Sequence, residues 1–438
     1  MNSQDNIIAM QTSTLFLKRM LPTALALGTA WAARGQIGHE YGATWAAAIG
    51  IFTVIALSGR EDWMGRLPSI VALGAIAWGS GGIISYGMVV GYGYAPDLLN
   101  TSYGLTMLMV IGSLYGFMGG GITGLALEST PAKKVDWAAV FTQMFAGGFL
   151  FWGFFIHQLE WFMTPPRSEL WAGCMGASLA LGWYLYRNGY SHALRTALFS
   201  ALGAGFGFAF GNFLQRMGYV SQISFNWWNV MEYSIGFFGG LGMAYGIFSG
   251  NKWPRTVAPD RVSNRIGWVF LIVLLPTINL LEAVTTERMI KTAQGIQASD
   301  PAAFAYTWQS FLWIISLIFM VVLGVFYYRP AIRFTQRTVV HITLLYLAWY
   351  IILSNFISAI WHTPKFVSQH LYWLNLAVLA WLLYRNTPYP MAENEGSSHP
   401  YANHLMKWWI AAVAIILLVS YIAVSINYVH PNTQLRFK

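Results

Sequence analysis

The feature that most constrains this chain is a succession of apolar runs, each long enough to cross a bilayer. A membrane-spanning helix needs about 20 mainly apolar residues. Because backbone polar groups inside a bilayer must be satisfied within their own segment, such runs are expected to be helical. The sequence therefore predicts an all-α polytopic membrane protein with about 13 transmembrane helices. The predicted spans are residues 20–38, 42–58, 67–90, 102–127, 137–158, 168–187, 194–215, 227–249, 264–284, 306–328, 337–361, 366–384 and 405–427.

The distribution of charge agrees with this class. Only 9% of the 438 residues are charged, against about 25% in soluble proteins. The net charge of +9 does not indicate a nucleic-acid partner, because Lys and Arg lie in short loops between apolar runs. Alternate loops hold 15 and 6 of them. The positive-inside rule then predicts a plasma (inner) membrane protein with a cytoplasmic N-terminus and an extracytoplasmic C-terminus.

The first apolar run also resembles a secretory signal. Lys18-Arg19 precede the run, and Ala30-Trp31-Ala32 imitates a small-residue cleavage site. Whether residues 1–32 are removed stays open at this point. We favour retention, because the glycine-bearing segment that follows looks like part of the fold.

Glycine usage divides the chain into two parts. Only four of the 43 glycines follow Gly250. We expect a Gly-rich eight-helix membrane domain over residues 1–250, a cytoplasmic basic linker over 251–263, and a five-helix membrane domain over 264–438. Within the first part, three Ala-Leu-Gly openings and a fourth, Phe-Ala-Gly-Gly, suggest four helical hairpins, although tripeptides this apolar also recur by chance.

Several glycines recur every fourth residue and therefore share one helix face. Such a face lets the backbone of another helix approach closely. Tight helix packing explains most of these glycines, and unwinding beside a ligand is the alternative. The series are Gly112, Gly116, Gly120 and Gly124; Gly203, Gly207 and Gly211; and Gly242, Gly246 and Gly250.

The segment Arg34 to Gly42 carries the first group of candidate functional residues. Arg34 lies about one turn inside the end of its apolar run, where a charge is costly and functional by default. It either pairs with an acid or the headgroups, or binds a carboxylate or phosphate through its planar guanidinium. His39 and Glu40 follow in a glycine-rich turn. They suit proton transfer or metal ligation, but also an ordinary interfacial loop.

Two further sites are candidates on the same predicted side of the membrane. His157 and Glu160 lie three residues apart, so on a helix they would share a face. They form a polar cluster, a proton relay, or two of the ligands that a metal site would need. Glu232 follows a Trp-Trp pair near a helix start. It either interacts with the helix dipole or acts as a proton-coupling carboxylate or general base.

Two functions from different classes remain. The first is a secondary transporter or permease for a small polar, perhaps anionic, solute, in which Arg34 and the carboxylates bind the solute and a coupling proton. The second is a membrane-embedded glycosyl or acyl transferase that uses a lipid-linked substrate at the extracytoplasmic face. No Walker, zinc-protease or nucleophile-elbow motif is present. We expect no cofactor and no metal, and the sequence leaves a homo-oligomer open.

Overall fold

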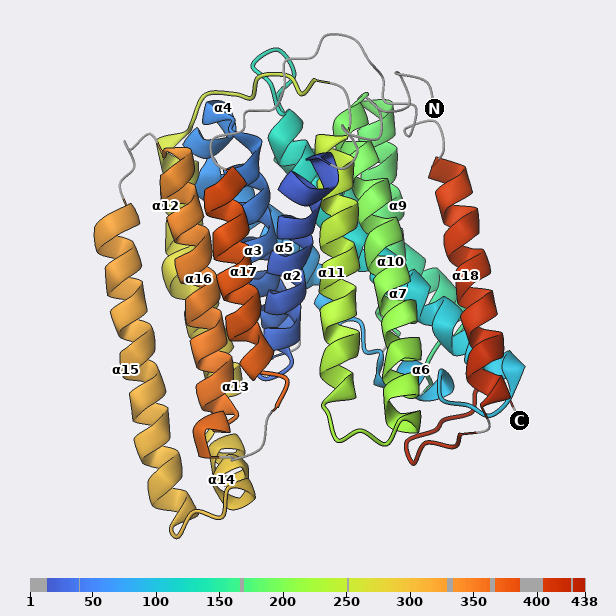
Figure 1. Ribbon diagram of the computed structural model, residues 1–438. Helices are drawn as coiled ribbons and strands as arrows, with labels where there is room; N and C mark the ends of the chain where they lie inside the picture. Colours follow the sequence, from blue (N-terminus) through green and yellow to red (C-terminus); the bar gives the residue numbers. More distant parts are fainter. Residues whose placement is uncertain are drawn as a thin grey trace, which may run out of the picture.

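The computed structural model describes residues 14–38, 40–165, 169–249, 252–328, 334–362, 367–386, 405–426 and 428–437 (Figure 1). Within these ranges every regular element is a helix. Eight of the described helices are long and apolar enough to cross a membrane. The chain is therefore all-helical over its described part, as a polytopic membrane protein would be.

The helices of the first 250 residues coincide with the predicted runs, with one exception. The predicted run 67–90 is divided, because the helix breaks after Ile83 and a short helix starts at Gly87. The elements are η1 (Phe16–Met20), α2 (Leu21–Arg34), α3 (Glu40–Ser58), α4 (Glu61–Gly65), α5 (Leu67–Ser80), η2 (Gly81–Ile83), α6 (Gly87–Tyr92), α7 (Leu98–Glu128), α8 (Trp137–Trp152), η3 (Gly153–Gln158), α9 (Trp171–Arg187), α10 (Ser191–Val220) and α11 (Trp227–Phe248).

The remaining helices include one that the apolar pattern could not show. The loop expected after residue 284 contains α14, which is amphipathic and too polar to resemble a span. The elements are α12 (Arg261–Val269), η4 (Phe270–Leu274), α13 (Leu275–Ala283), α14 (Thr286–Gly295), α15 (Pro301–Tyr327), α16 (Gln336–Ile357), η5 (Ile360–His362), α17 (His370–Asn386) and α18 (Leu405–Ser425).

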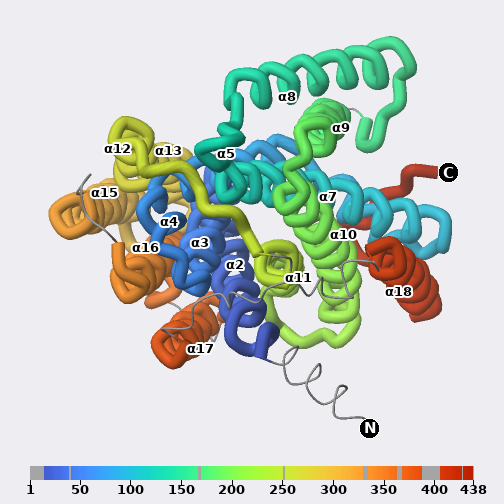
Figure 2. The backbone as a smooth tube through the Cα atoms, turned by 90° about the horizontal axis from the view of Figure 1, so that it is seen from above, coloured from blue at the N-terminus to red at the C-terminus, as the bar shows by residue number. Residues whose placement is uncertain are grey.

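Six helices form a closed ring at the centre of the molecule. Going round it, α2 packs against α3, α3 against α5, α5 against α7, α7 against α10, α10 against α11, and α11 against α2. Figure 2 shows these six helices surrounded by the others. All six come from the glycine-rich first part of the chain.

The ring is filled by large aromatic side chains. Trp31 of α2 contacts the rings of Trp78 and Tyr115 edge-on, with centroid distances of 6.1 and 5.7 Å. Each of the three is about 1% exposed. We call these three residues the aromatic plug. They make the middle of the ring a packed core rather than an open channel.

The glycine series allow four of the helices to approach backbone to backbone. A methyl group on the glycines of α7 would collide with α10, one on those of α10 with α11, and one on those of α11 with α2. Tight packing is thereby confirmed for the predicted glycines of α7 and α10, and for Gly242 and Gly246, which pack against α10; Gly250 lies outside the described residues. The α7 glycines are Gly112, Gly116, Gly120 and Gly124; the α10 glycines are Gly203, Gly207 and Gly211; the α11 glycines are Gly236 and Gly240.

The other helices are distributed around the ring. Helices α12, α16 and α17 pack against α5, α3 and α2, whereas α18 packs against α7 and α10. The α8–α9 hairpin lies against α7, and α15 stands at the edge of the molecule (Figures 1 and 2). Helices that follow Gly250 thus lie on both flanks of the ring. The division into two sequence domains stays a prediction.

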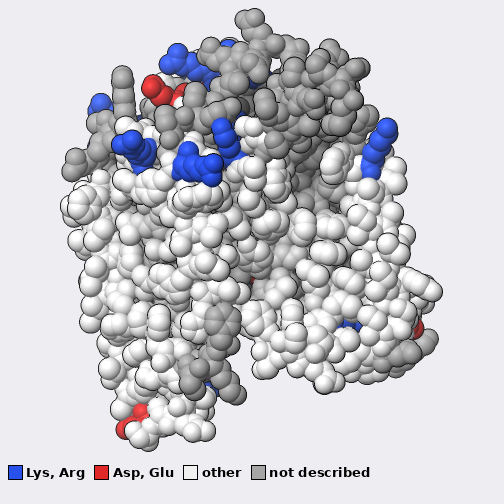
Figure 3. Space-filling model, viewed as in Figure 1, with Lys and Arg blue, Asp and Glu red and all other residues white. Residues whose placement is uncertain are grey.

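Lys and Arg gather along one edge of the molecule (Figure 3), which we call the basic side. The polar linker crosses this side and is fastened to the start of α4. Arg60 donates hydrogen bonds to the carbonyls of Trp253 and Pro254, at 2.8 and 2.7 Å. Asp62 accepts one from the backbone N–H of Thr256 at 2.9 Å. Linker residues 253–256 are therefore tied to the segment that joins α3 to α5.

Candidate functional site

A buried ion pair lies at the end of α2 that is farthest from the basic side. Arg34, the last residue of α2, pairs with Glu232 in the second turn of α11. Both side chains are 2% exposed. We call them the central pair. Because an isolated charge in a low-dielectric interior is very costly, each of these residues depends on the other.

Tyr86 bridges the central pair. Its hydroxyl accepts a hydrogen bond from Nη2 of Arg34 at 2.8 Å and donates one to Oε1 of Glu232 at 2.6 Å. Tyr86 lies in the non-helical segment between η2 and α6. Three elements far apart in the sequence therefore meet in one charged cluster.

The ring aromatics hold the central pair in place. The guanidinium of Arg34 lies over the ring of Trp31 at 5.1 Å, so the aromatic plug directly adjoins the pair on its basic side. Trp228 donates a hydrogen bond from Nε1 to Oε1 of Glu232 at 3.2 Å, and its ring stacks on Tyr86 at 6.3 Å. Trp228 is 37% exposed. It is therefore the member of this cluster that reaches the molecular surface.

The turn after α2 keeps Arg34 close to its neighbours. A side chain on Gly42 would meet Cγ of Arg34 at 2.6 Å and the hydroxyl of Tyr350 at 3.0 Å. Tyr350 in turn donates a hydrogen bond to the carbonyl of Gly42 at 3.0 Å. Glycine at this position thus lets α3 and α16 close around the arginine.

A second polar group connects the site to later helices. The side-chain carbonyl of Gln36 accepts hydrogen bonds from Ser354 at 2.9 Å and from Tyr372 at 3.3 Å. Asn229, one turn before Glu232, donates a hydrogen bond to Tyr372 at 2.5 Å. We call Gln36, Asn229, Ser354 and Tyr372 the outer network. It joins α11, α16 and α17 to the turn after α2, next to the central pair.

The non-helical backbone near Tyr86 is held by buried side chains. Arg216 of α10, which is fully buried, donates to the carbonyls of Gly93 and Ala95 at 3.1 and 3.0 Å. The end of the chain covers the same region, since Asn100 accepts hydrogen bonds from the backbone of Arg436 and Phe437. The bonds from Arg216 satisfy carbonyls that the segment between α6 and α7 leaves outside a helix, and Asn100 satisfies backbone N–H groups of the C-terminal segment.

The structure places the predicted site residues in different surroundings. Arg34 and Glu232 are in direct contact. His39 lies outside the described residues, and Glu40 begins α3 but its side chain is not described, so the roles considered for these two residues stay predictions.

The predicted pair His157 and Glu160 does not share a helix face as expected. His157 and Glu160 are both exposed on the peripheral α8–α9 hairpin. The helix ends at Gln158, and Glu160 has a left-handed backbone with φ of 53°. His157 instead packs edge-on against Trp152 at 4.5 Å. This pair belongs to a separate part of the surface, away from the central ring.

Tyr86 is the residue that sequence reasoning missed. With 23 tyrosines in the chain, its type carries no signal. The available signal was the run Gly79-Ser80-Gly81-Gly82, because small residues late in an apolar segment favour a helix break. A broken helix inside a membrane exposes backbone and side chains to a site.

The side chains at this site are of types that can bind an anion or exchange a proton. Arg34 offers a planar set of donors that matches a carboxylate or phosphate. Glu232 can hold a negative charge or a proton, and Tyr86 can donate to either partner. Within the described ranges, no three His, Cys, Asp or Glu side chains gather as a metal ion would require.

Comparison with known proteins leaves this geometry as the basis for function. No protein-family model, curated protein or solved structure matches the chain.

Proposed function

We propose that the chain is a secondary transporter or permease for a small polar solute that carries a carboxylate or phosphate. The observation that carries the proposal is the central pair, a charge pair buried where helices end or break. Buried charge of this kind is costly to insert and marks solute or ion pathways in membrane proteins. The thirteen apolar runs support about 13 transmembrane helices in the plasma (inner) membrane. The positive-inside rule supports a cytoplasmic basic side and an extracytoplasmic C-terminus.

The proposed cycle exchanges one negative charge for another on Arg34. When a proton neutralises Glu232, the ion pair with Arg34 is lost and the guanidinium binds the anionic group of the solute. When Glu232 releases the proton, it regains Arg34 and displaces the solute. One proton therefore accompanies one negative charge, and Tyr86 supplies a hydrogen bond in both states.

The aromatic plug and the outer network suit the two sides of such a site. The plug fills the ring between Arg34 and the basic side, which supports closure toward the cytoplasm. The outer network offers polar partners to a solute that approaches from the opposite side. Alternating access then requires the plug residues to separate while the outer network closes.

The transferase hypothesis is less well supported. A general base must reach the hydroxyl of an acceptor substrate. Glu232 is only 1% exposed and is already engaged by Arg34, Tyr86 and Trp228. This arrangement favours a carboxylate that is exposed only during a conformational change.

The first test is native mass spectrometry of the full-length protein, purified in mild detergent. A co-purified carboxylate or phosphate solute is expected, and a lipid-linked donor would instead favour the transferase. Uptake into proteoliposomes is then measured with that solute, or with a mixture of small carboxylates and phosphates, under an inward proton gradient.

Conservative variants distinguish binding from coupling. Glu232→Gln should retain solute exchange but lose acceleration by the proton gradient. Arg34→Lys should weaken solute binding, because an ammonium lacks the planar fork of donors. Glu287→Gln is the matched control, since Glu287 forms an exposed ion pair with Lys291 and should transport like the wild type. Gradient-driven uptake by Glu232→Gln at the wild-type rate would exclude the proposed coupling.

A further inference from the structure

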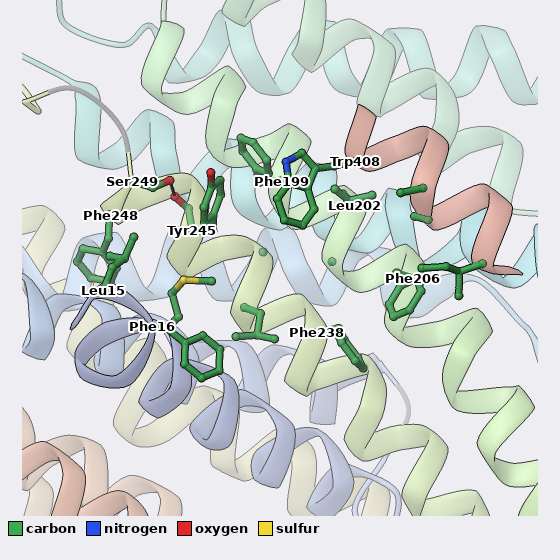
Figure 4. Close-up of a pocket in the computed structure, with 17 residues that line it drawn as sticks. Leu15, Phe16, Phe199, Leu202, Phe206, Phe238, Tyr245, Phe248, Ser249 and Trp408 are labelled. Carbon is green, nitrogen blue, oxygen red and sulfur yellow. Dashed lines mark hydrogen bonds between the residues drawn. The ribbon is translucent and has the colours of Figure 1, made fainter. Parts of the chain in front are cut away.

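A groove on the side of the ring is unrelated to the central pair. It has a volume of about 530 Å³ and lies between η1, α10, α11 and α18. Figure 4 shows Tyr245 and Ser249 at one end of this lateral groove, and Phe206 and Phe238 farther along it. Its volume falls within the range of about 300–1,000 Å³ typical of small-ligand sites.

The lateral groove is apolar along its length and opens to the molecular surface. Phe16 and Trp408, which line it on opposite sides, are 39% and 50% exposed. In a membrane protein, the surface on this flank faces lipid chains. The groove thus suits a hydrocarbon chain that enters sideways from the bilayer.

One end of the groove is surrounded by cations. Arg195 of α10 donates a hydrogen bond to the hydroxyl of Ser249 at 2.6 Å, and its guanidinium lies 5.4 and 5.8 Å from the rings of Phe199 and Tyr245. All three of these partners line the groove. Arg19 lies over a fourth lining residue, Phe248, at 5.0 Å.

Arg19 and Arg195 come from different elements, η1 and α10, and both contact residues at this end of the groove. Lys407, exposed at the start of α18, adjoins the lining residue Trp408. Within the described part of the chain, Arg195 has no carboxylate in ion-pair contact, and its buried Nε has no hydrogen-bond partner. The groove itself contains no acidic residue among those that line it. Its open end is thus strongly complementary to an anion.

We infer that the lateral groove binds one anionic phospholipid from the leaflet on the basic side. One acyl chain lies along Phe199, Phe206 and Phe238, and the phosphate is held by Arg195 and the neighbouring cations. The charge at the mouth selects the anionic headgroup, whereas the apolar lining accepts any acyl chain. The site is independent of the solute cycle proposed for Arg34 and Glu232.

The test uses the full-length protein exchanged into nanodiscs that contain equal amounts of dioleoyl phosphatidylglycerol and dioleoyl phosphatidylcholine. Native mass spectrometry after release from the nanodisc should show one retained phosphatidylglycerol per chain. Arg195→Gln should lower the ratio of retained phosphatidylglycerol to phosphatidylcholine about fivefold, which corresponds to about 1 kcal/mol per basic residue at a membrane surface. Arg195→Lys should keep most of the preference. Arg187→Gln is the control, because Arg187 is an exposed arginine at the end of α9, a helix that contributes no residue to the groove.

A second pair of variants tests the groove itself. Ala411→Trp fills it from the exposed face of α18 and should reduce retention of both lipids. Val413→Trp, at an exposed residue of the same helix outside the lining, should not. The inference is overturned if the wild type shows no preference for phosphatidylglycerol, or if Arg195→Gln keeps it. It is also overturned if Ala411→Trp dissociates a dimer without changing lipid retention, because the occupant is then a second copy of the chain.

Discussion

The dependence of Arg34 and Glu232 on each other can be measured with a double-mutant cycle. Replacing one member of a buried ion pair typically costs about 3–5 kcal/mol, because the other charge stays buried without compensation. The two members should differ. Glu232→Leu removes the carboxylate partner of a guanidinium that cannot lose its proton, while the hydroxyl of Tyr86 and the ring of Trp31 stay beside it. We expect a loss near the upper end, about 5 kcal/mol.

Arg34→Met should cost less, about 3 kcal/mol, because a carboxylate can be neutralised by a proton. Glu232 also keeps its hydrogen bonds from Tyr86 and Trp228 in this variant. The double variant Arg34→Met/Glu232→Leu should be more stable than either single variant, since it removes both charges together. It should still be inactive.

Equilibrium unfolding in mixed micelles, followed by circular dichroism at increasing fractions of sodium dodecyl sulfate, gives the four free energies of unfolding. The double-mutant cycle isolates the interaction between the two side chains. If the cost of the double variant equals the sum of the single costs, the side chains do not stabilise each other and the reasoning fails.

Three further predictions concern packing, the linker and the segment beside Tyr86. Gly116→Leu should lower stability by several kcal/mol and impair assembly, because Gly116 packs against the backbone of α10. Gly324→Leu should be tolerated, because the space beside Gly324 is open. Equal thermal stability of the two variants would contradict this prediction. Asp62→Asn should destabilise the fold by about 1–2 kcal/mol at neutral pH. Burial acts to raise the pKa of Asp62, but hydrogen bonds from Arg60 and the linker backbone outweigh burial and hold the pKa below its usual value. The difference in stability between variant and wild type should therefore be present above about pH 4 and disappear as the pH falls further. A stability difference that grows on acidification would refute this prediction. Arg216→Gln should increase hydrogen exchange in residues 90–97, since the guanidinium binds carbonyls there, and unchanged exchange would show that it is dispensable.

Much of the helical framework follows from the sequence, because the period and length of apolar runs are local properties. The glycine series predicted tight packing for the same reason, since spacing by four places residues on one face. The helix that each glycine face contacts is not determined by the nearby sequence. Gly116 meets α10 and Gly207 meets α11, and nothing in their spacing identifies these partners.

The candidate site was predictable only in part. The cost of burying charge singled out Arg34, and helix position singled out Glu232, each from its own surroundings. Their partnership depends on ring closure by α11 against α2, which no local pattern encodes. For His157 and Glu160 the local argument itself failed. Their spacing places them on one face only if both lie on a helix, and the helix ends between them.

The central pair also has a consequence for synthesis. Its two members are separated by 198 positions in the chain. At a synthesis rate of about 5–20 residues per second, Arg34 emerges about 10–40 s before Glu232 has been made. A charge on a lone apolar helix is costly to insert, and Arg34 stands at the end of α2. We therefore expect this end of α2 to stay near the membrane surface until α11 has been made and completes the ring.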